Sequence, residues 1–255
     1  MLRVDDLSLH RGGSCLCRKL QLRVEPGQIW ALLGTNGIGK STLLHSLAGL
    51  LPTPRETIHL QGKPLGDYSR RELARRLGLL FQHQEDPFPL TVRETAEQSV
   101  FPHHALWQSP PADRLQRIDQ VLEDLQLTAL GGRDIRTLSG GERQRLALAG
   151  LLIQSPALWL LDEPTNHLDI PHQIRLLDTL SAIARQGRTG MLIALHDVNQ
   201  AQRLASHVLL MLEQGRWLAG SRADMLTAGH LQQVYGCPFR RLYDPQSGAS
   251  CWQAI

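Results

Sequence analysis

The sequence predicts an α/β fold built on a parallel sheet, because strands and helices alternate at both ends of the chain. Unbroken apolar runs, typical of buried strands, occupy residues 29–33, 157–161, 190–195 and 208–212, with helical stretches between the later ones. Such alternation is typical of a parallel sheet. The middle of the chain, residues 83–155, is mostly helical in pattern, and we expect it to be an insertion into this fold.

The elements on either side of the insertion follow from local patterns. Before it, β-rich runs, a Glu-Pro-Gly turn and helical periodicity predict strands at 4–9, 20–24 and 79–81, a turn at 25–27, and helices at 40–50 and 69–77. After the last buried strand, a turn at 213–215 precedes a helix predicted over 221–235 and a short tail. No internal repeat or low-complexity segment interrupts this order.

Length and composition restrict the class of protein. The 255 residues, 42% of them apolar, support one large domain or two small ones with ample core. No apolar run approaches the ~20 residues that cross a bilayer, and the first residues, Met1 to Asp6, contain no apolar signal core. If this protein works at a membrane, we expect its transmembrane part to be another chain.

The basic residues give no indication of a nucleic-acid partner. Of the 27 Lys and Arg residues 24 are Arg, and they are scattered along the chain rather than clustered. Aromatic residues make up 5% of the chain, too few for a platform on which bases stack. We therefore expect no nucleic acid among the partners.

A phosphate-binding loop is predicted between the strand at 29–33 and the helix at 40–50. This segment matches the pattern G-x-x-x-x-G-K-[ST] in full and comprises Gly34, Thr35, Asn36, Gly37, Ile38, Gly39, Lys40 and Ser41. The glycines let successive backbone N–H groups surround phosphate oxygens, and the following helix directs its positive end at the same oxygens. We expect Lys40 to reach the β and γ phosphates and the Ser41 hydroxyl to bind Mg²⁺.

Two carboxylates follow the buried strand at 157–161. Asp162 stands at the end of a strand that accompanies a phosphate loop, which suits a ligand of Mg²⁺, either direct or through water. Glu163 is the next residue and points the opposite way on a strand, so it could orient a water molecule for in-line attack. The presence of a phosphate loop favours this interpretation over ordinary acidic residues at a strand end.

A second helix has a start suited to anions. The segment Leu138, Ser139, Gly140, Gly141 and Glu142 opens a helix predicted to run to Ile153. Ser139 and Glu142, three residues apart, form a capping box. The two glycines in the first turn expose backbone N–H groups to an approaching anion, at some cost in helix propensity. The sequence therefore predicts a second helix that faces phosphate.

These motifs together resemble the nucleotide-binding subunit of an ATP-binding cassette transporter. They are the phosphate loop, Leu138–Glu142, the run Leu-Leu-Asp-Glu-Pro-Thr-Asn-His-Leu-Asp at 160–169, and His196, and they occur in the order typical of that family. The resemblance covers nearly the whole chain. It implies a P-loop NTPase core with a parallel sheet, an N-terminal antiparallel β subdomain and an inserted helical subdomain. The implied division of this single domain, 1–255, is 1–82 and 156–235 for the RecA-like core with its β subdomain, 83–155 for the helical signature subdomain, and 236–255 for a C-terminal tail.

The resemblance also implies ATP and Mg²⁺ as ligands and assigns roles to matching positions. Gln82 matches the glutamine that switches between γ-phosphate, Mg²⁺ and permease, and His196 matches the histidine that hydrogen-bonds the γ-phosphate. With Glu163 these form the implied catalytic set. Thr42 extends the nucleotide-binding loop, and Gln82 joins Ser41 and Asp162 as an implied metal ligand.

A dimer is implied in the same way. Leu138–Glu142, with Ser139 and its glycines, serves in this family the nucleotide held by the other subunit, and Asp169 lies in the loop that crosses to that subunit. A second copy of this chain is therefore an implied partner, with two ATP molecules held between the copies.

One position departs from the family pattern. Where the family usually stacks adenine on an aromatic side chain near the end of the first strand, this chain has Arg11, with His10 beside it. A guanidinium plane is able to stack on a base, and we expect Arg11 to contact the nucleotide. Apolar contacts to the base, with phosphate contacts dominating affinity, are the alternative.

The kind of cassette ATPase follows from two further stretches. The segment from His83 to Glu94 and the ending from Gln233 to Arg241 resemble importer subunits for cobalamin, haem or ferric siderophores. This implies a membrane permease dimer, a periplasmic or surface substrate-binding protein, and a peripheral location on the cytoplasmic face of the inner membrane. Phe88 and Leu90 are then expected to anchor a short permease helix. A soluble iron–sulfur cluster assembly ATPase, or the ATPase of an export or lipid-trafficking complex, is the alternative.

Overall fold

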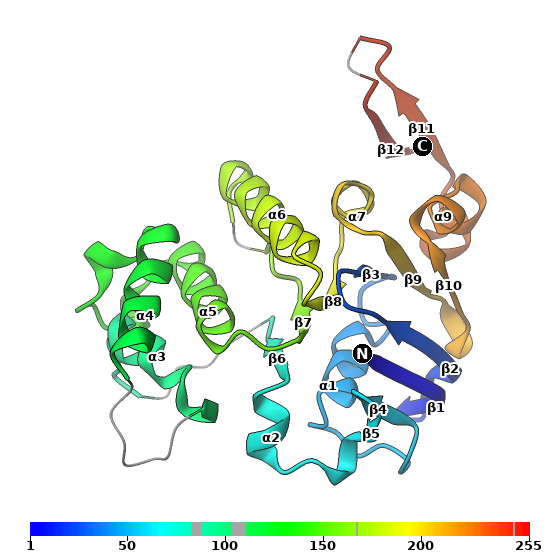
Figure 1. The fold of residues 1–255 in the computed structure, drawn as a ribbon. Coiled ribbons are helices and arrows are strands. Elements are labelled where there is room, and N and C mark those ends of the chain that lie inside the picture. The colour runs from blue at the N-terminus through cyan, green and yellow to red at the C-terminus, as the bar shows by residue number, and fades with distance from the viewer. Residues whose placement is uncertain (83–87, 104–110, 167, 247) are drawn as a thin grey trace.

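The computed structural model describes residues 1–255 except 83–87, 104–110, 167 and 247, and its centre is a six-stranded sheet (Figure 1). The strand order is β10-β9-β3-β8-β7-β6. The bounds are β3 (Ile29–Leu33), β6 (Leu77–Leu80), β7 (Leu158–Asp162), β8 (Gly190–Ala194), β9 (His207–Met211) and β10 (Trp217–Ser221). The pairs among β9, β3, β8, β7 and β6 are parallel, and β10 pairs antiparallel with β9. The predicted α/β class with a parallel sheet is confirmed.

The register of this sheet brings four chain segments to one edge. Ala194 at the end of β8 pairs with Leu32 of β3 on one side and with Asp162 of β7 on the other. Leu80, the last residue of β6, pairs with Leu161. Because parallel strands end at the same edge, the segments that follow β3, β6, β7 and β8 all begin there.

Two layers cover the sheet on opposite faces. Alternate strand residues such as Leu32 and Leu192 pack against α1 (Lys40–Leu47) and a second, antiparallel sheet of order β2-β1-β4-β5. Its strands are β1 (Leu2–Arg11), β2 (Ser14–Val24), β4 (Ile58–Leu60) and β5 (Lys63–Pro64). The other face, with Ala31 and Ile193, packs against α6 (Ile170–Arg185), α7 (Val198–Leu204) and α9 (Ala228–Tyr235).

The helices of the insertion, drawn in green in Figure 1, pack their apolar side chains into a third hydrophobic cluster. They are α3 (Val92–Gln98), α4 (Ala112–Asp124) and α5 (Gly140–Gln154). Helix α5 belongs to two clusters at once: Leu146 and Ile153 pack within the insertion, whereas Leu148 and Leu151 pack with the sheet face that α6 covers. This helix therefore connects the insertion to the sheet.

Several element boundaries differ from the sequence prediction. The helix predicted over 221–235 is wrong: Leu226 leaves helical geometry between α8 (Arg222–Met225) and α9, and Thr227 begins α9 by accepting a hydrogen bond from the His230 N–H. The tail forms a hairpin of β11 (Phe239–Tyr243) and β12 (Ser250–Ala254).

The helix predicted over 69–77 is shorter in the structure. It is α2 (Arg70–Ala74), because Leu77 already belongs to β6. In the part of the chain that the structure describes, no helix combines the length and the apolar character needed to span a bilayer.

Candidate functional site

The phosphate loop connects β3 to α1 at the sheet edge where the four segments meet. Gly39, the N-cap of α1, has φ of 112°, a left-handed conformation that suits glycine. No side chain caps the helix there, so the first N–H groups of α1 point to the loop without a side-chain partner. A Cβ on Gly39 would also lie 3.0 Å from the side chain of Leu16 in β2. The backbone conformation and the open helix start together suit an anion at this turn.

Lys40 holds a buried positive charge under this loop. Its side chain is only 6% exposed, and its Nζ donates to the carbonyl oxygens of Gly34 at 2.9 Å and Thr35 at 3.2 Å. Burial lowers the pKa of Lys40, and the nearby carboxylates of Glu163 and Asp162 oppose that shift. The ammonium group therefore gains from any additional negative charge that enters the loop.

Asp162 ends β7 beside the loop and is 1% exposed. Burial raises the pKa of this carboxyl, a hydrogen bond with Ser41 opposes the shift, and the charge of Glu163 adds to it. Among the described residues, Oδ1 of Asp162 has no hydrogen-bond partner. A buried oxygen with an open position next to a hydroxyl suits Mg²⁺, which is usually held by one or two carboxylates together with substrate phosphates.

The described part of the chain contains no group of three or more His, Cys, Asp and Glu side chains placed to hold a metal.

Glu163 lies at the centre of a hydrogen-bond network and is 5% exposed. Its Oε2 accepts from Nε2 of Gln82 at 2.6 Å and from Nδ2 of Asn166 at 2.5 Å, and its Oε1 faces Nε2 of His196 in an ion-pair contact. The segments that follow β6, β7 and β8 thus converge on one carboxylate.

The prediction that Glu163 continues the strand and points away from Asp162 by strand alternation is wrong. The strand β7 ends at Asp162, and Glu163 takes a left-handed backbone with φ of 53°. The N–H of Glu163 donates to the carbonyl of Ala194 at 3.1 Å, which holds this turn against β8. The local turn, and not continued pleating, therefore sets the direction of the carboxylate.

Lys40, Glu163 and their neighbours line one open cavity of about 650 Å³, whereas Asp162 and Asn166 do not line it. It is lined by Arg11, Ser14, Leu16, Asn36, Gly37, Gly39, Lys40, Ser41, Thr42, Gln82, Glu163 and His196. Arg11 reaches the cavity wall by donating from Nη1 to the Thr42 hydroxyl at 3.0 Å. Its guanidinium is therefore held against the first turn of α1.

The remaining predicted residues lie elsewhere in the chain. Ser139 N-caps α5, and its N–H donates to Glu142 Oε2 at 2.7 Å while Glu142 N–H donates to Ser139 Oγ at 3.3 Å, which confirms the predicted capping box. Ser139 and Gly140 are exposed, Leu138 packs into the insertion, and none of Leu138–Glu142 lines the cavity. Asp169 N-caps α6 and does not line it either.

Sequence reasoning missed Asn166, Ser14 and Leu16. Asn166 lies three residues after Glu163, and its N–H donates to the Glu163 carbonyl at 3.1 Å in a tight turn. An asparagine three residues after a carboxylate at a strand end is typical of such a turn, and this pattern could have indicated Asn166. Ser14 and Leu16 reach the cavity from β2 only through the packing of the second sheet, and no local pattern indicates it.

The segment after Gln82 is partly described. Residues 83–87 lie outside the described part of the chain. Phe88 is 67% exposed, whereas Leu90 packs against the insertion and its carbonyl accepts from Ile135 N–H at 2.9 Å. Of the two expected anchors for a permease helix, only Phe88 therefore presents an exposed side chain.

Known proteins are similar to this chain over nearly its full length. A family model described as ABC transporter matches residues 17–166. The ferric enterobactin transport ATP-binding protein FepC of Escherichia coli (strain K12) is 36% identical over 248 residues, which are 97% of this chain and 91% of that protein. The hemin import ATP-binding protein HmuV of Hydrogenovibrio crunogenus is 34% identical over 257 residues, covering 96% of this chain and 97% of that protein.

A solved structure agrees with the sequence relatives. A chain of a metal-chelate type ABC transporter in an inward-facing conformation is 27% identical and superposes with a TM-score of 0.85, covering 100% of this chain and 97% of that one.

Proposed function

The chain belongs to the ABC transporter family, and from this premise we propose that it is the ATP-hydrolysing subunit of an importer for iron chelates, either ferric siderophores or haem. One observation carries the importer assignment: the likeness to FepC, HmuV and the metal-chelate transporter extends over more than nine-tenths of each chain. The site described above supports the ATPase part of the proposal.

The nucleotide is bound mainly through its phosphates. Backbone N–H groups of Gly34–Ser41 and the open start of α1 surround the β and γ phosphates, and Lys40 supplies the buried positive charge. Thr42 continues the loop, and Arg11, held at Thr42, contacts the nucleotide from the α1 side. Asp162, Ser41 and Gln82 would hold Mg²⁺, which neutralises charge that develops on the phosphates.

Hydrolysis is assigned to the network around Glu163. The carboxylate orients a water molecule for in-line attack on the γ-phosphate and accepts its proton. Gln82 and Asn166 fix the carboxylate by two hydrogen bonds, and His196 on its other oxygen faces the γ-phosphate position. The network keeps Glu163 in one orientation before ATP arrives.

A second copy of the chain completes each site. Leu138–Glu142 lies away from the cavity, and Ser139 and Gly140 are exposed at the start of α5. In a head-to-tail dimer this helix start contacts the phosphates of the ATP held by the other copy, and Asp169 lies in the segment that crosses to it. Two ATP molecules then close the dimer, because each gains a second set of donors only on closure.

The proposed partners follow from import. A membrane permease dimer receives the motion of the insertion through the exposed Phe88, and a substrate-binding protein delivers the chelate from outside. The ATPase is then peripheral, on the cytoplasmic face of the inner membrane.

Reconstitution tests this proposal. The chain is co-expressed with a permease, purified as a complex, and placed in proteoliposomes with a binding protein and ⁵⁵Fe-labelled siderophore or haem. Uptake that requires ATP and Mg²⁺ supports the importer. Copurification with a soluble scaffold complex, or ATP-driven movement in the outward direction only, contradicts it.

A further inference from the structure

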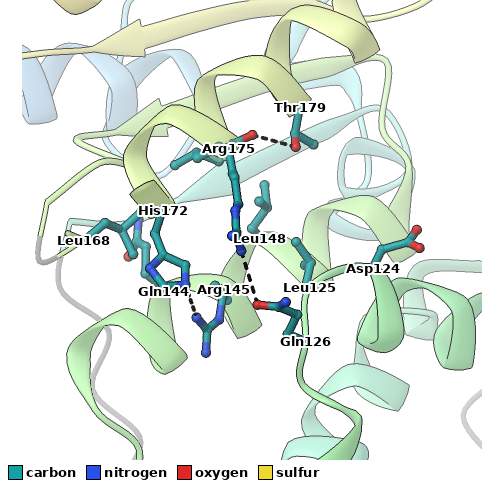
Figure 2. A pocket seen from close by; sticks show the side chains of 11 residues that line it. Asp124, Leu125, Gln126, Gln144, Arg145, Leu148, Leu168, His172, Arg175 and Thr179 are labelled. Carbon is teal, nitrogen blue, oxygen red and sulfur yellow. Dashed lines mark hydrogen bonds between the residues drawn. The ribbon is translucent and has the colours of Figure 1, made fainter. Parts of the chain in front are cut away.

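Helix α5 contacts the segment after Glu163 as well as carrying Ser139 at its N-terminus. In its second turn, Nε2 of Gln144 donates to the carbonyl of Pro164 at 2.8 Å. The next residue, Arg145, has its Nη1 2.8 Å from Nε2 of His172 in α6 (Figure 2). Two adjacent side chains of one helix thus reach both ends of the segment that runs from the catalytic carboxylate to α6.

The contact to α6 continues to Asp169. A guanidinium only donates, so Nε2 of His172 is the acceptor and Nδ1 carries the hydrogen of the neutral ring. That Nδ1 contacts Oδ1 of Asp169, which also accepts from the His172 backbone N–H at 3.1 Å. The pKa of Asp169 is lowered first by the side-chain hydrogen bond from His172 and then by the backbone one. A neutral imidazole therefore joins a cation on α5 to a carboxylate at the start of α6.

Apolar packing does not fix these two helices by itself. A cavity of about 120 Å³ lies between α5 and α6, walled by Leu125, Leu148, Leu168 and Leu176. Figure 2 shows Arg145 and His172 along one side of it and Arg175 reaching Gln126 along another, the latter bond being 3.4 Å. Because side chains around a cavity have fewer contacts on that side, the hydrogen bonds at its edge contribute to the relative position of the helices.

We propose that Gln144, Arg145 and His172 form a latch that sets the position of Glu163 according to the position of α5. This inference rests on the proposed function, in which the Ser139 end of α5 contacts the ATP of the other copy. Movement of α5 on that contact is passed through the latch to Pro164, the neighbour of Glu163, and to Asp169. The latch residues are positioning residues, and they make hydrolysis at one site depend on ATP at the other.

Two substitutions of His172 distinguish its contact with Arg145 from its contact with Asp169. The amide of Gln reaches the position of Nε2 and accepts from Arg145, whereas the amide of Asn reaches only the position of Nδ1 and donates to Asp169. His172→Gln therefore keeps the connection to α5, and Asp169 stays held by the His172 backbone N–H. His172→Asn keeps the side-chain hydrogen bond to Asp169 and loses the connection to α5.

Arg145→Met and Arg175→Met form a matched pair. Both remove a guanidinium from the same cavity and replace it with a side chain of similar length. Arg145 contacts the latch histidine, whereas Arg175 bonds to Gln126, two residues after the end of α4.

The experiment measures kcat and KM for ATP on the full-length chain, together with the urea midpoint of each variant. We expect His172→Asn and Arg145→Met to lower kcat about tenfold with KM within about twofold, since misplacing a catalytic group affects the chemical step. His172→Gln and Arg175→Met should stay near wild type in kcat, and all four should unfold at similar urea concentrations.

Two results would overturn the latch. One is equal kcat in the Asn and Gln variants, and the other is a similar loss in Arg145→Met and Arg175→Met. A wild-type chain that fails to hydrolyse ATP would instead overturn the proposed function itself, so the two failures are distinguishable.

Discussion

The two halves of the proposed ATP site differ in how they hold charge and hydrogen-bonding groups. At the sheet edge, Lys40, Asp162 and Glu163 are each at most 6% exposed, and one carboxylate oxygen of Asp162 lacks a partner among the described residues. At the start of α5, Ser139 is exposed and its capping box with Glu142 is complete. The sheet-edge half is therefore incomplete without a ligand, whereas the helix half is stable without one and available to a second molecule.

The carboxylates of the two halves show the same contrast. Burial raises the pKa of Asp162, whereas the hydrogen bond from the Ser139 backbone N–H lowers the pKa of Glu142. One half carries a carboxylate that opposes folding when charged, and the other carries one that favours it.

The largest effect is expected from a substitution that removes the catalytic base from the sheet-edge half of the site. Glu163→Gln keeps the shape of the side chain but loses the base, and we expect kcat to fall about 10³-fold while ATP affinity is retained. Steady-state kinetics and equilibrium binding of ATP measure the two quantities, and the variant should accumulate as an ATP-bound dimer. Turnover close to wild type would remove Glu163 from its assigned role.

The next effect tests the helix half. Ser139→Arg places a large cation at the exposed start of α5, and we expect kcat to fall about 10²-fold because donors to the other copy's phosphates are blocked. ATP binding to the monomer should change less than about twofold, since Ser139 does not line the cavity of its own chain. A large loss of monomer binding would contradict the assignment of this helix to the second copy.

A smaller effect concerns stability at the sheet edge. Asp162→Asn removes a buried carboxylate whose Oδ1 has no partner among the residues that the structure describes, and we expect Tm of the nucleotide-free chain to rise by about 2–4 °C near neutral pH. Burial raises the pKa of Asp162 in the folded state. The contribution of Asp162 to the stability of the wild-type chain is therefore greatest at low pH, where its carboxyl is protonated, and it is lost as the pH rises through that pKa. The gap between variant and wild type should therefore close on acidification. A variant less stable than wild type at neutral pH would contradict this account.

The smallest effect has the opposite sign of pH dependence. Glu142→Gln preserves a capping box but loses the charge, and we expect Tm to fall by at most about 2 °C near neutral pH. The folded pKa of Glu142 is lowered, so its contribution is present above the ordinary pKa of 4.5 and is lost as pH falls through the lowered value. Thermal unfolding between pH 3 and 8 checks both carboxylates. Parallel pH curves for the two variants would disprove the contrast.

The parts of the fold that sequence predicted are those with local causes. The strand at Ile29–Leu33 agrees with the structure to the residue because five consecutive apolar side chains are buried on both faces of a parallel sheet. The capping box at Ser139 needs only residues three apart. Both features depend on short stretches of chain, which a single sequence contains in full.

The parts that sequence missed depend on distant contacts. The hairpin of β11 and β12 is fixed by Asn199 of α7, whose amide donates to and accepts from the backbone of Trp252. The hydrogen bond from Arg11 to Thr42 joins residues 31 positions apart. The direction of Glu163 depends on a turn held against β8. No pattern in the neighbouring residues of the sequence indicates any of these three contacts.

The left-handed backbone at Glu163 has a consequence for engineering. A φ of 53° suits glycine or asparagine better than glutamate, so the glutamate at this position costs backbone strain. The hydrogen bonds from Gln82 and Asn166 to its carboxylate offset that strain, because Gly would remove the buried acceptor altogether and Asn would shorten it by one methylene. A library selected for heat resistance should therefore leave codon 163 unmutated, since relaxing the backbone there disrupts the network and removes the catalytic base together.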